Sequence, residues 1–175
     1  MSIACWRFVL GTVCVYGLAA SVVAATPSPT LPPNIIVDRA LETIVARMLD
    51  RSPTFRGQVV QLGSMVLVRI RVVLDPSLAT SATRPMCRAD GLLRRYTFGR
   101  IDALIRLPSD KNAPELIAHE LEHVREFVEG VNFRLQAARL HSGVWHAYSG
   151  HYETARALAI GHRVALEVKR GTALH

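Results

Sequence analysis

The 175-residue sequence predicts an α+β protein in which one folded domain combines a small sheet of about three strands with several helices. Half of the residues are hydrophobic and 20 % are charged, a balance typical of a globular domain that buries a core. Stretches with apolar residues at alternate positions indicate strands, and stretches with apolar residues at helical spacing precede and follow them. The 11 glycines and 9 prolines are too few for a collagen-like chain, and the apolar content excludes a disordered one.

The N-terminal segment is typical of a secretory signal peptide. Arg7 is the only charged residue before Asp38, and residues 8–25 form an apolar run that ends in small side chains. We expect cleavage after Ala25, where the sequence reads Val-Ala-Ala-Thr, and therefore a periplasmic or secreted protein. The alternative is an uncleaved membrane anchor, since about 18 apolar residues can just span a bilayer.

The chain thus divides into a signal peptide (residues 1–25), a Pro-rich linker (26–33) and a folded domain (34–175). The prolines predict a stiff, extended linker. Cleavage would remove two of the three cysteines and leave Cys87, so no internal disulfide is expected in the mature chain. Cys87 lies in a turn-rich loop, where it is either an ordinary thiol or a thiolate that reaches an active-site metal.

The net charge of +7 comes from 21 basic and 14 acidic residues, and nearly all of the basic residues are arginines. These arginines are scattered along the chain and are not interleaved with aromatic residues. The pattern argues against a nucleic-acid-binding protein. It favours generally anionic surroundings, such as cell-wall polymers or lipid headgroups.

The first predicted element of the folded domain is an amphipathic helix over residues 35–49. Its apolar residues recur at helical spacing, Asn34 can cap its start, and the pair Ser52-Pro53 ends it. This N-terminal helix is expected to cover part of the sheet.

Strands are predicted in the middle of the domain. Residues 64–74 alternate between apolar and polar side chains before Asp75-Pro76, and residues 100–107 alternate again before Pro108. Residues 92–98 can form another strand between them. The sheet is therefore expected to have about three strands.

A helix with the residues of a metal site is predicted over residues 113–129. Pro114 suits its first turn, and Gly130 suits the position after its end. The helix contains His119-Glu120-Leu121-Glu122-His123, which is an H-E-x-x-H motif. Histidines four residues apart lie on one face of a helix, so their ring nitrogens can bind the same zinc ion.

The faces of this helix agree with a zinc site. At about 100° per residue, both histidines fall at the edge of the apolar arc and Glu120 falls inside it. Glu122 and Glu126 fall on the polar side, together with Glu129. A carboxylate in a core-facing stripe is costly unless it has a partner or a function, so Glu120 is the candidate general base.

Several residues could supply a third metal ligand. A histidine ligand soon after the motif requires a glycine that turns the chain back, but Glu126 stands at that position, so the continuing helix points Glu129 away. Histidines further along the chain are another option. They are His141, His146 and His151.

Glu153 is the better candidate for the third ligand. Residues 152–169 predict a C-terminal helix whose apolar stripe carries Glu153 as its only carboxylate, whereas Arg156 and the other charged residues point outward. Packed against the motif helix, Glu153 would complete a set of two histidines and one glutamate, as in thermolysin-type zinc sites. The alternative is a buried Glu153 that pairs with an arginine or caps the helix.

With these residues the chain resembles the gluzincin metallopeptidases over residues 101–168, where a strand, the H-E-L-E-H helix and a glutamate helix follow in order. The likeness is to small single-domain gluzincins and to the catalytic cores of membrane-associated peptidases. It implies a minimal zincin-like fold and zinc-dependent hydrolysis of peptide bonds, with Glu120 as general base on a zinc-bound water. It also implies that the strand 100–107 is an edge on which an extended substrate adds.

The resemblance leaves two parts of the site open. Those families often have a supporting aspartate about four residues after the ligand glutamate, where this chain has Ala157. A donor to the oxyanion is also expected, and His146 and Tyr148 are the candidates in a segment rich in histidine and tyrosine. The alternative for this segment is a packed aromatic loop with solvated histidines.

The expected partner is a peptide or protein substrate, including a cell-wall peptide, and the protein is expected to be a monomer with Zn²⁺ as its cofactor. A second hypothesis is a non-hydrolytic zinc-binding envelope protein that interacts with anionic partners. A third is a membrane-tethered basic adaptor without metal, which requires an uncleaved N-terminal segment.

Overall fold

The structure is a computed structural model that describes residues 30–80, 90–96, 99–147 and 151–171. Within these residues the chain has a mixed α+β fold with five α-helices, a four-stranded sheet and a two-stranded sheet. The predicted signal peptide, Cys87 and Tyr148 lie outside the described residues. No helix in the described part of the chain is long and apolar enough to cross a membrane.

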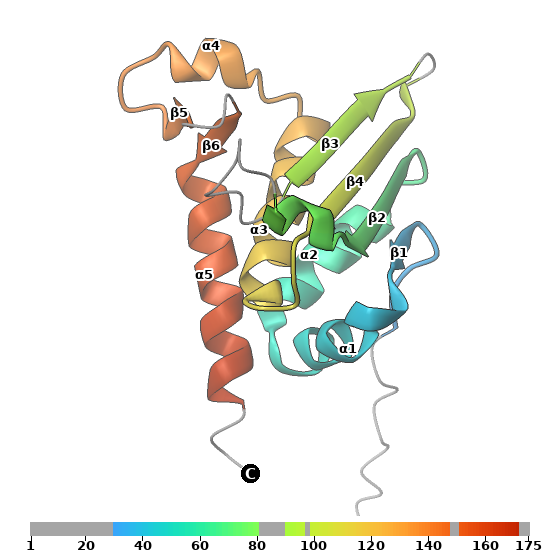
Figure 1. The fold of residues 1–175 in the computed structure, drawn as a ribbon. Coiled ribbons are helices and arrows are strands. Elements are labelled where there is room, and N and C mark those ends of the chain that lie inside the picture. Colours follow the sequence, from blue (N-terminus) through green and yellow to red (C-terminus); the bar gives the residue numbers. More distant parts are fainter. Residues whose placement is uncertain (1–29, 81–89, 97–98, 148–150, 172–175) are drawn as a thin grey trace, which may run out of the picture.

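The main sheet has one antiparallel strand at its edge (Figure 1). Its order is β1 (Ile35–Val37), β2 (Val68–Leu74), β4 (Ile101–Leu107) and β3 (Asp90–Arg95). The first three strands are parallel, and β3 runs antiparallel to β4. Alternate residues of β2 and β4 are buried in a core shared with the helices, so the helices pack against one face of the sheet.

The predicted helix over residues 35–49 is wrong at its start. Residues 35–37 form β1, a short 3₁₀ turn spans Arg39–Leu41, and α1 covers Glu42–Arg51. The first three residues are β-branched and pair in parallel with β2, which stabilises them as a strand. Asn34 does not cap a helix. Its side-chain amide donates to the carbonyl oxygens of Leu62, Met65 and Val68.

Ser52 and Pro53 end the first helix as predicted, and they also begin a second one. In α2 (Pro53–Gly63) the Ser52 hydroxyl accepts a hydrogen bond from the backbone N–H of Phe55 and Pro53 stands in the first turn. No helix was predicted from the sequence over residues 53–63. The following strand starts at Val68 instead of residue 64, and Val66 before it is 94 % exposed.

The strand predicted over residues 100–107 is confirmed as β4, and its alternate residues are buried. Its expected position at the edge is wrong, because β4 lies between β2 and β3. Within the described residues the two edge strands are β1 and β3, and β3 corresponds to the strand predicted over residues 92–98.

Two long helices, α3 (Ala113–Val128) and α5 (Ala155–Arg170), lie side by side (Figure 1). A Cβ atom at Gly161 of α5 would be 2.8 Å from the carbonyl oxygen of Glu115 and 3.0 Å from Cβ of His119. Gly161 therefore allows the two helix backbones to approach closely beside the H-E-x-x-H motif.

Three short elements connect α3 to α5. They are α4 (Phe133–Ala137) and the hairpin of β5 (Val144–His146) and β6 (Tyr152–Thr154). The predicted C-terminal helix over residues 152–169 thus begins at Ala155, and its first three residues are a strand. The Thr154 hydroxyl accepts from the backbone N–H of Ala157 and caps α5.

The other end of the described chain also contacts the folded part. Leu31 packs against the core, and the ring of Pro32 occupies the space that a Cβ atom on Gly63 would need. The last residues of the predicted linker are therefore packed on the domain.

Candidate metal centre

His119, His123 and Glu153 form a group that could hold a metal ion, with ligand atoms all within 4.8 Å of one another. The two histidines are one turn apart on α3, and Glu153 comes from β6. Glu153 Oε2 is 3.4 Å from His119 Nε2, and its Oε1 is 3.2 Å from His123 Nε2. The structure thus brings the three residues predicted from the sequence together.

The donor set fits a zinc ion. Imidazole nitrogens and a carboxylate oxygen are its usual ligands, and two donors about 2.0–2.1 Å from a tetrahedral ion stand roughly 3.3 Å apart. The two Nε2···O distances of 3.4 and 3.2 Å, each to a different oxygen of Glu153, are close to that separation. All three side chains are partly exposed, at 14 %, 16 % and 22 %, so the group is accessible from solvent.

Glu153 lies in the strand before α5 and not on the helix itself. Its neighbour across the hairpin is Trp145. The backbone N–H of Thr154 donates to Glu153 Oε1 at 2.8 Å. The extended backbone and the cap at Thr154 therefore hold Glu153 at the start of α5, facing the histidines.

Glu126 contacts one of the two histidines. Its predicted position on the polar side of the helix is wrong, because Glu126 is buried. Its side chain is only 3 % exposed. One oxygen, Oε2, is 3.0 Å from His123 Nδ1 and accepts a hydrogen bond from Thr154 Oγ1 at 3.1 Å. This contact leaves Nε2 of His123 directed at Glu153, and it links the ligand histidine to the cap of α5.

Glu122 is likewise buried, contrary to the prediction. It is fully buried and accepts hydrogen bonds from Gln58 Nε2 at 2.7 Å and from Arg156 Nε at 2.5 Å. Arg156 also binds Glu129 with two hydrogen bonds. The predicted outward position of Arg156 is therefore wrong, because this side chain ties α5 to α3 three residues after Glu153.

The ion pairs between α3 and α5 shift the pKa values of their members. The pKa of Arg156 is raised by hydrogen bonds to Glu129 and by the nearby Glu122, and the pKa of Glu129 is lowered chiefly by Arg156. Arg156 and Glu129 therefore each stabilise the charged form of the other.

In the metal-free protein His123 carries a proton at neutral pH. Burial lowers the pKa of His123, but hydrogen bonds to Glu126 and Glu153 outweigh burial and raise the pKa to about 9. Burial raises the pKa of Glu153, but hydrogen bonds from His119 and His123 outweigh it and hold the pKa well below its usual range. The proton and the metal therefore compete for His123.

The alternative third ligands make other contacts. Glu129 pairs with Arg156 and Arg125. His146 is exposed and packs edge-on against Tyr152, at 5.3 Å between ring centroids. Within the described residues the group that could hold a metal contains neither of them. His146 stands across the hairpin from Tyr152, next to Glu153, and it remains a candidate oxyanion donor.

Glu120 faces the edge strand of the sheet. A Cβ atom on Gly91 of β3 would lie 2.6 Å from Glu120 Oε2. The Glu120 carboxylate therefore fills the space that a larger residue at position 91 would need, between α3 and β3. Gly91 was not among the residues predicted from the sequence, because the role of a glycine in a strand depends on which side chain packs against it.

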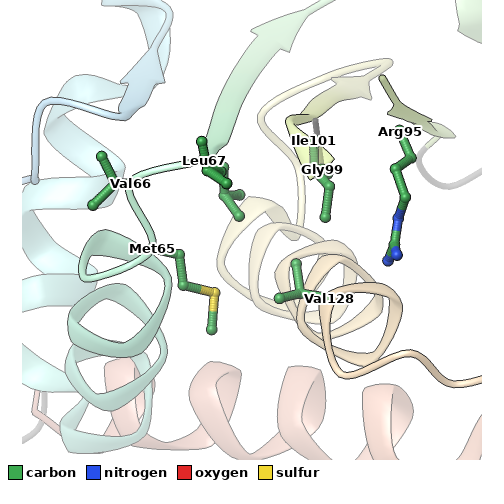
Figure 2. A pocket seen from close by; sticks show the side chains of 8 residues that line it. Met65, Val66, Leu67, Arg95, Gly99, Ile101 and Val128 are labelled. Carbon is green, nitrogen blue, oxygen red and sulfur yellow. The ribbon is translucent and has the colours of Figure 1, made fainter. Parts of the chain in front are cut away.

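Two cavities lie near the end of α3, and neither is lined by the three ligand residues. The larger, about 550 Å³, is mostly apolar and lies beside Met65, Leu67 and Val128 (Figure 2). The smaller, about 380 Å³, is lined by Phe133 and by Tyr152, which precedes Glu153 in the chain. Only the smaller cavity is adjacent to the metal-binding group, since the Phe133 ring is 6.1 Å from that of His123.

Comparisons with known proteins find no match, whether with protein families, curated proteins or solved structures.

Glu126→Gln is expected to weaken metal binding by about 10- to 100-fold, because it removes the negative charge that orients His123. The glutamine has the same size and can still accept from Thr154. Affinity is measured by competition with a chromophoric chelator. Glu129→Gln is the matched control, since Glu129 caps the end of the same helix and its ion pairs are with arginines. Equal affinities for wild type and Glu126→Gln would contradict this role.

Metal affinity is expected to rise with pH up to about pH 9, because binding displaces the proton held by His123. One proton released per ion makes the apparent binding constant increase about tenfold per pH unit below that value and level off above it. Calorimetric titration in two buffers of different ionisation enthalpy counts the released protons. A binding constant that does not change between neutral pH and about pH 9 would show that His123 is not protonated in the metal-free protein.

Proposed function

We propose that the chain is an exported zinc-dependent peptidase with a minimal zincin-like fold, similar to the gluzincin metallopeptidases. The observation that carries this proposal is the convergence of His119, His123 and Glu153 within 4.8 Å, beside the carboxylate of Glu120. The buried contacts of Glu126 supply the support for a ligand histidine that Ala157 cannot provide. The apolar N-terminal segment supports export.

His119, His123 and Glu153 would hold the zinc ion, which when bound acts as a Lewis acid that polarises a carbonyl group and lowers the pKa of water. Glu120 is the general base. It takes a proton from the attacking water and returns it to the amine that leaves when the peptide bond breaks. His146 is a candidate donor to the oxyanion. Tyr148 is another, at a position outside the described residues.

The substrate is proposed to bind as an extended strand along β3. Within the described residues β3 pairs on one side only, so its other side presents free backbone N–H and C=O groups. Gly91 places this strand against Glu120. A peptide that pairs with β3 would therefore run past the proposed base.

Gly91→Ala is expected to lower kcat/KM for peptide hydrolysis by about 10- to 100-fold, because the new methyl group displaces the Glu120 carboxylate and misplaces the base. Bound zinc should remain unchanged, since Gly91 does not contact the ligands. Gly57→Ala is the control, because a Cβ atom there meets nothing within 4 Å. Unchanged hydrolysis by Gly91→Ala would argue against this placement of Glu120.

The proposed function is tested on purified, zinc-loaded protein with a complex peptide mixture as substrate. Elemental mass spectrometry measures bound zinc, and peptide mass spectrometry detects new termini. We expect about one zinc per chain and cleavage that a chelator stops. Protein that holds zinc but cleaves nothing, from mildly acidic to mildly alkaline pH, would instead favour the non-hydrolytic envelope protein that binds anionic partners.

A further inference from the structure

The smaller cavity beside the metal-binding group has a distinct chemical character. Its volume is about 380 Å³, and it lies between the end of β3, the end of α3 and the start of α4. The side chains that define it are two arginines and three aromatic residues. They are Arg95, Arg134, Phe127, Phe133 and Tyr152, and we refer to this set as the arginine subsite.

The arginine subsite is contiguous with the metal-binding group. The ring of Phe133 is 6.1 Å from that of His123 and stacks with the ring of Tyr152 at 6.4 Å between centroids. Tyr152 directly precedes Glu153 in β6. A peptide whose scissile bond lies at the three ligands can therefore place a neighbouring side chain in this cavity.

The charge of the subsite is positive. No carboxylate is among the residues that line the cavity. The guanidinium group of Arg95 lies 5.1 Å from the centre of the Phe127 ring and donates to the Phe127 carbonyl oxygen at 3.1 Å. These two contacts hold the guanidinium in place and use one of its five N–H groups, so the others can bind a ligand.

Arg134 contributes a second cation to the lining, at the start of α4. It is exposed, and within the described residues it makes no ion pair. Three aromatic rings line the cavity together with the two arginines, and they displace part of the water around a bound side chain, which strengthens an attraction between charges. They also offer an apolar surface to the methylene groups of a glutamate side chain.

We propose that the arginine subsite binds an acidic side chain of the substrate, so that the enzyme prefers peptides with Glu or Asp next to the scissile bond. This inference rests on the proposed peptidase function. Arg95 and Arg134 recognise the carboxylate through charge-assisted hydrogen bonds, and Phe127, Phe133 and Tyr152 contact the rest of the side chain.

The test measures binding instead of turnover. Zinc-loaded Glu120→Gln protein is titrated against fluorescently labelled alanine peptides that carry one Glu, Gln, Leu or Arg at each position in turn. Fluorescence anisotropy reports affinity. At one position the Glu peptide should bind about tenfold more tightly than the Gln peptide, the effect of a charge-assisted hydrogen bond. The Arg peptide should bind most weakly there, and added salt should reduce the difference.

Arg95→Gln and Arg134→Gln should each lower the ratio of the two affinities, and the double variant should bring it close to one. Arg94→Gln is the matched control, because it changes the same charge in the same strand at a residue that does not line the cavity. The proposal would be overturned if the Glu and Gln peptides bound nearly equally at every position, or if no binding were measurable. It would also be overturned if the double variant kept the wild-type ratio of the two affinities.

These results separate the subsite from the peptidase function. Cleavage of the peptide mixture without an acidic preference would overturn the subsite and leave the peptidase intact. Selective binding of the Glu peptide by a protein that cleaves nothing would support the subsite and contradict the peptidase.

Discussion

Glu120→Gln is expected to lower peptide hydrolysis by a factor of about 100 to 10,000, the range typical of a positioned acid–base group. Glutamine has the size of glutamate but cannot take a proton from water at neutral pH. Because Glu120 is not one of the residues that converge on the metal position, the variant should keep about one zinc per chain and its thermal stability. Single-turnover assays and elemental analysis on the same sample measure both quantities.

The matched control for this substitution is Glu115→Gln, a change of the same type in the first turn of the same helix and outside the metal-binding group. It should leave hydrolysis unchanged. A Glu120→Gln variant that turns over at the wild-type rate would remove Glu120 from the mechanism. Loss of zinc along with activity would indicate that Glu120 is needed for metal binding, and would leave the base unidentified.

His123→Ala and Glu153→Ala are each expected to remove stoichiometric zinc and, with it, all hydrolysis. Each substitution deletes one of the three proposed protein ligands, and sites of this type need three to retain the ion. His123→Ala should also lower the thermal stability more than Glu153→Ala does, because it leaves the buried Glu126 carboxylate without its histidine partner. Metal content is measured after dialysis against a weak chelator, beside circular dichroism to confirm folding.

Two control variants distinguish Glu153 from the other third ligands considered. Glu129→Ala removes an acidic residue that binds arginines, and His146→Ala removes an exposed ring across the hairpin. Both should retain full metal content. If either lost the ion while Glu153→Ala retained it, the ligand set would be wrong.

The features that the sequence predicted well depend on residues close to one another in the chain. The strand β4 and the helix α3 follow from alternation and from helical spacing, which the backbone imposes within a few residues. The pairing of His119 with His123 follows from the helical turn in the same way. Glu153 was recognised because a lone carboxylate among apolar side chains requires a partner.

The errors occurred where a distant segment decides the outcome. Residues 35–37 have apolar side chains that are compatible with a helix or a strand, and backbone pairing with β2 stabilises the strand. The order of strands in the sheet, which makes β3 an edge strand and β4 an inner one, is also a property of long-range pairing. Gly91 belongs to the same class, because its role depends on Glu120 approaching from another element.

The sequence by itself therefore determined the α+β class, the motif helix and the three residues that converge, because each depends on periodicity or on the chemistry of single side chains. Only the tertiary structure decided what surrounds them. Helical spacing placed Glu122 and Glu126 on the polar side, yet both are buried, since α5 packs on that side. Arg156 of α5 is the partner of Glu122, and Thr154, which caps α5, is the partner of Glu126. A carboxylate can be buried when a partner offsets its loss of water, and that partner comes from about 30 residues away in the chain, beyond the range of any local pattern.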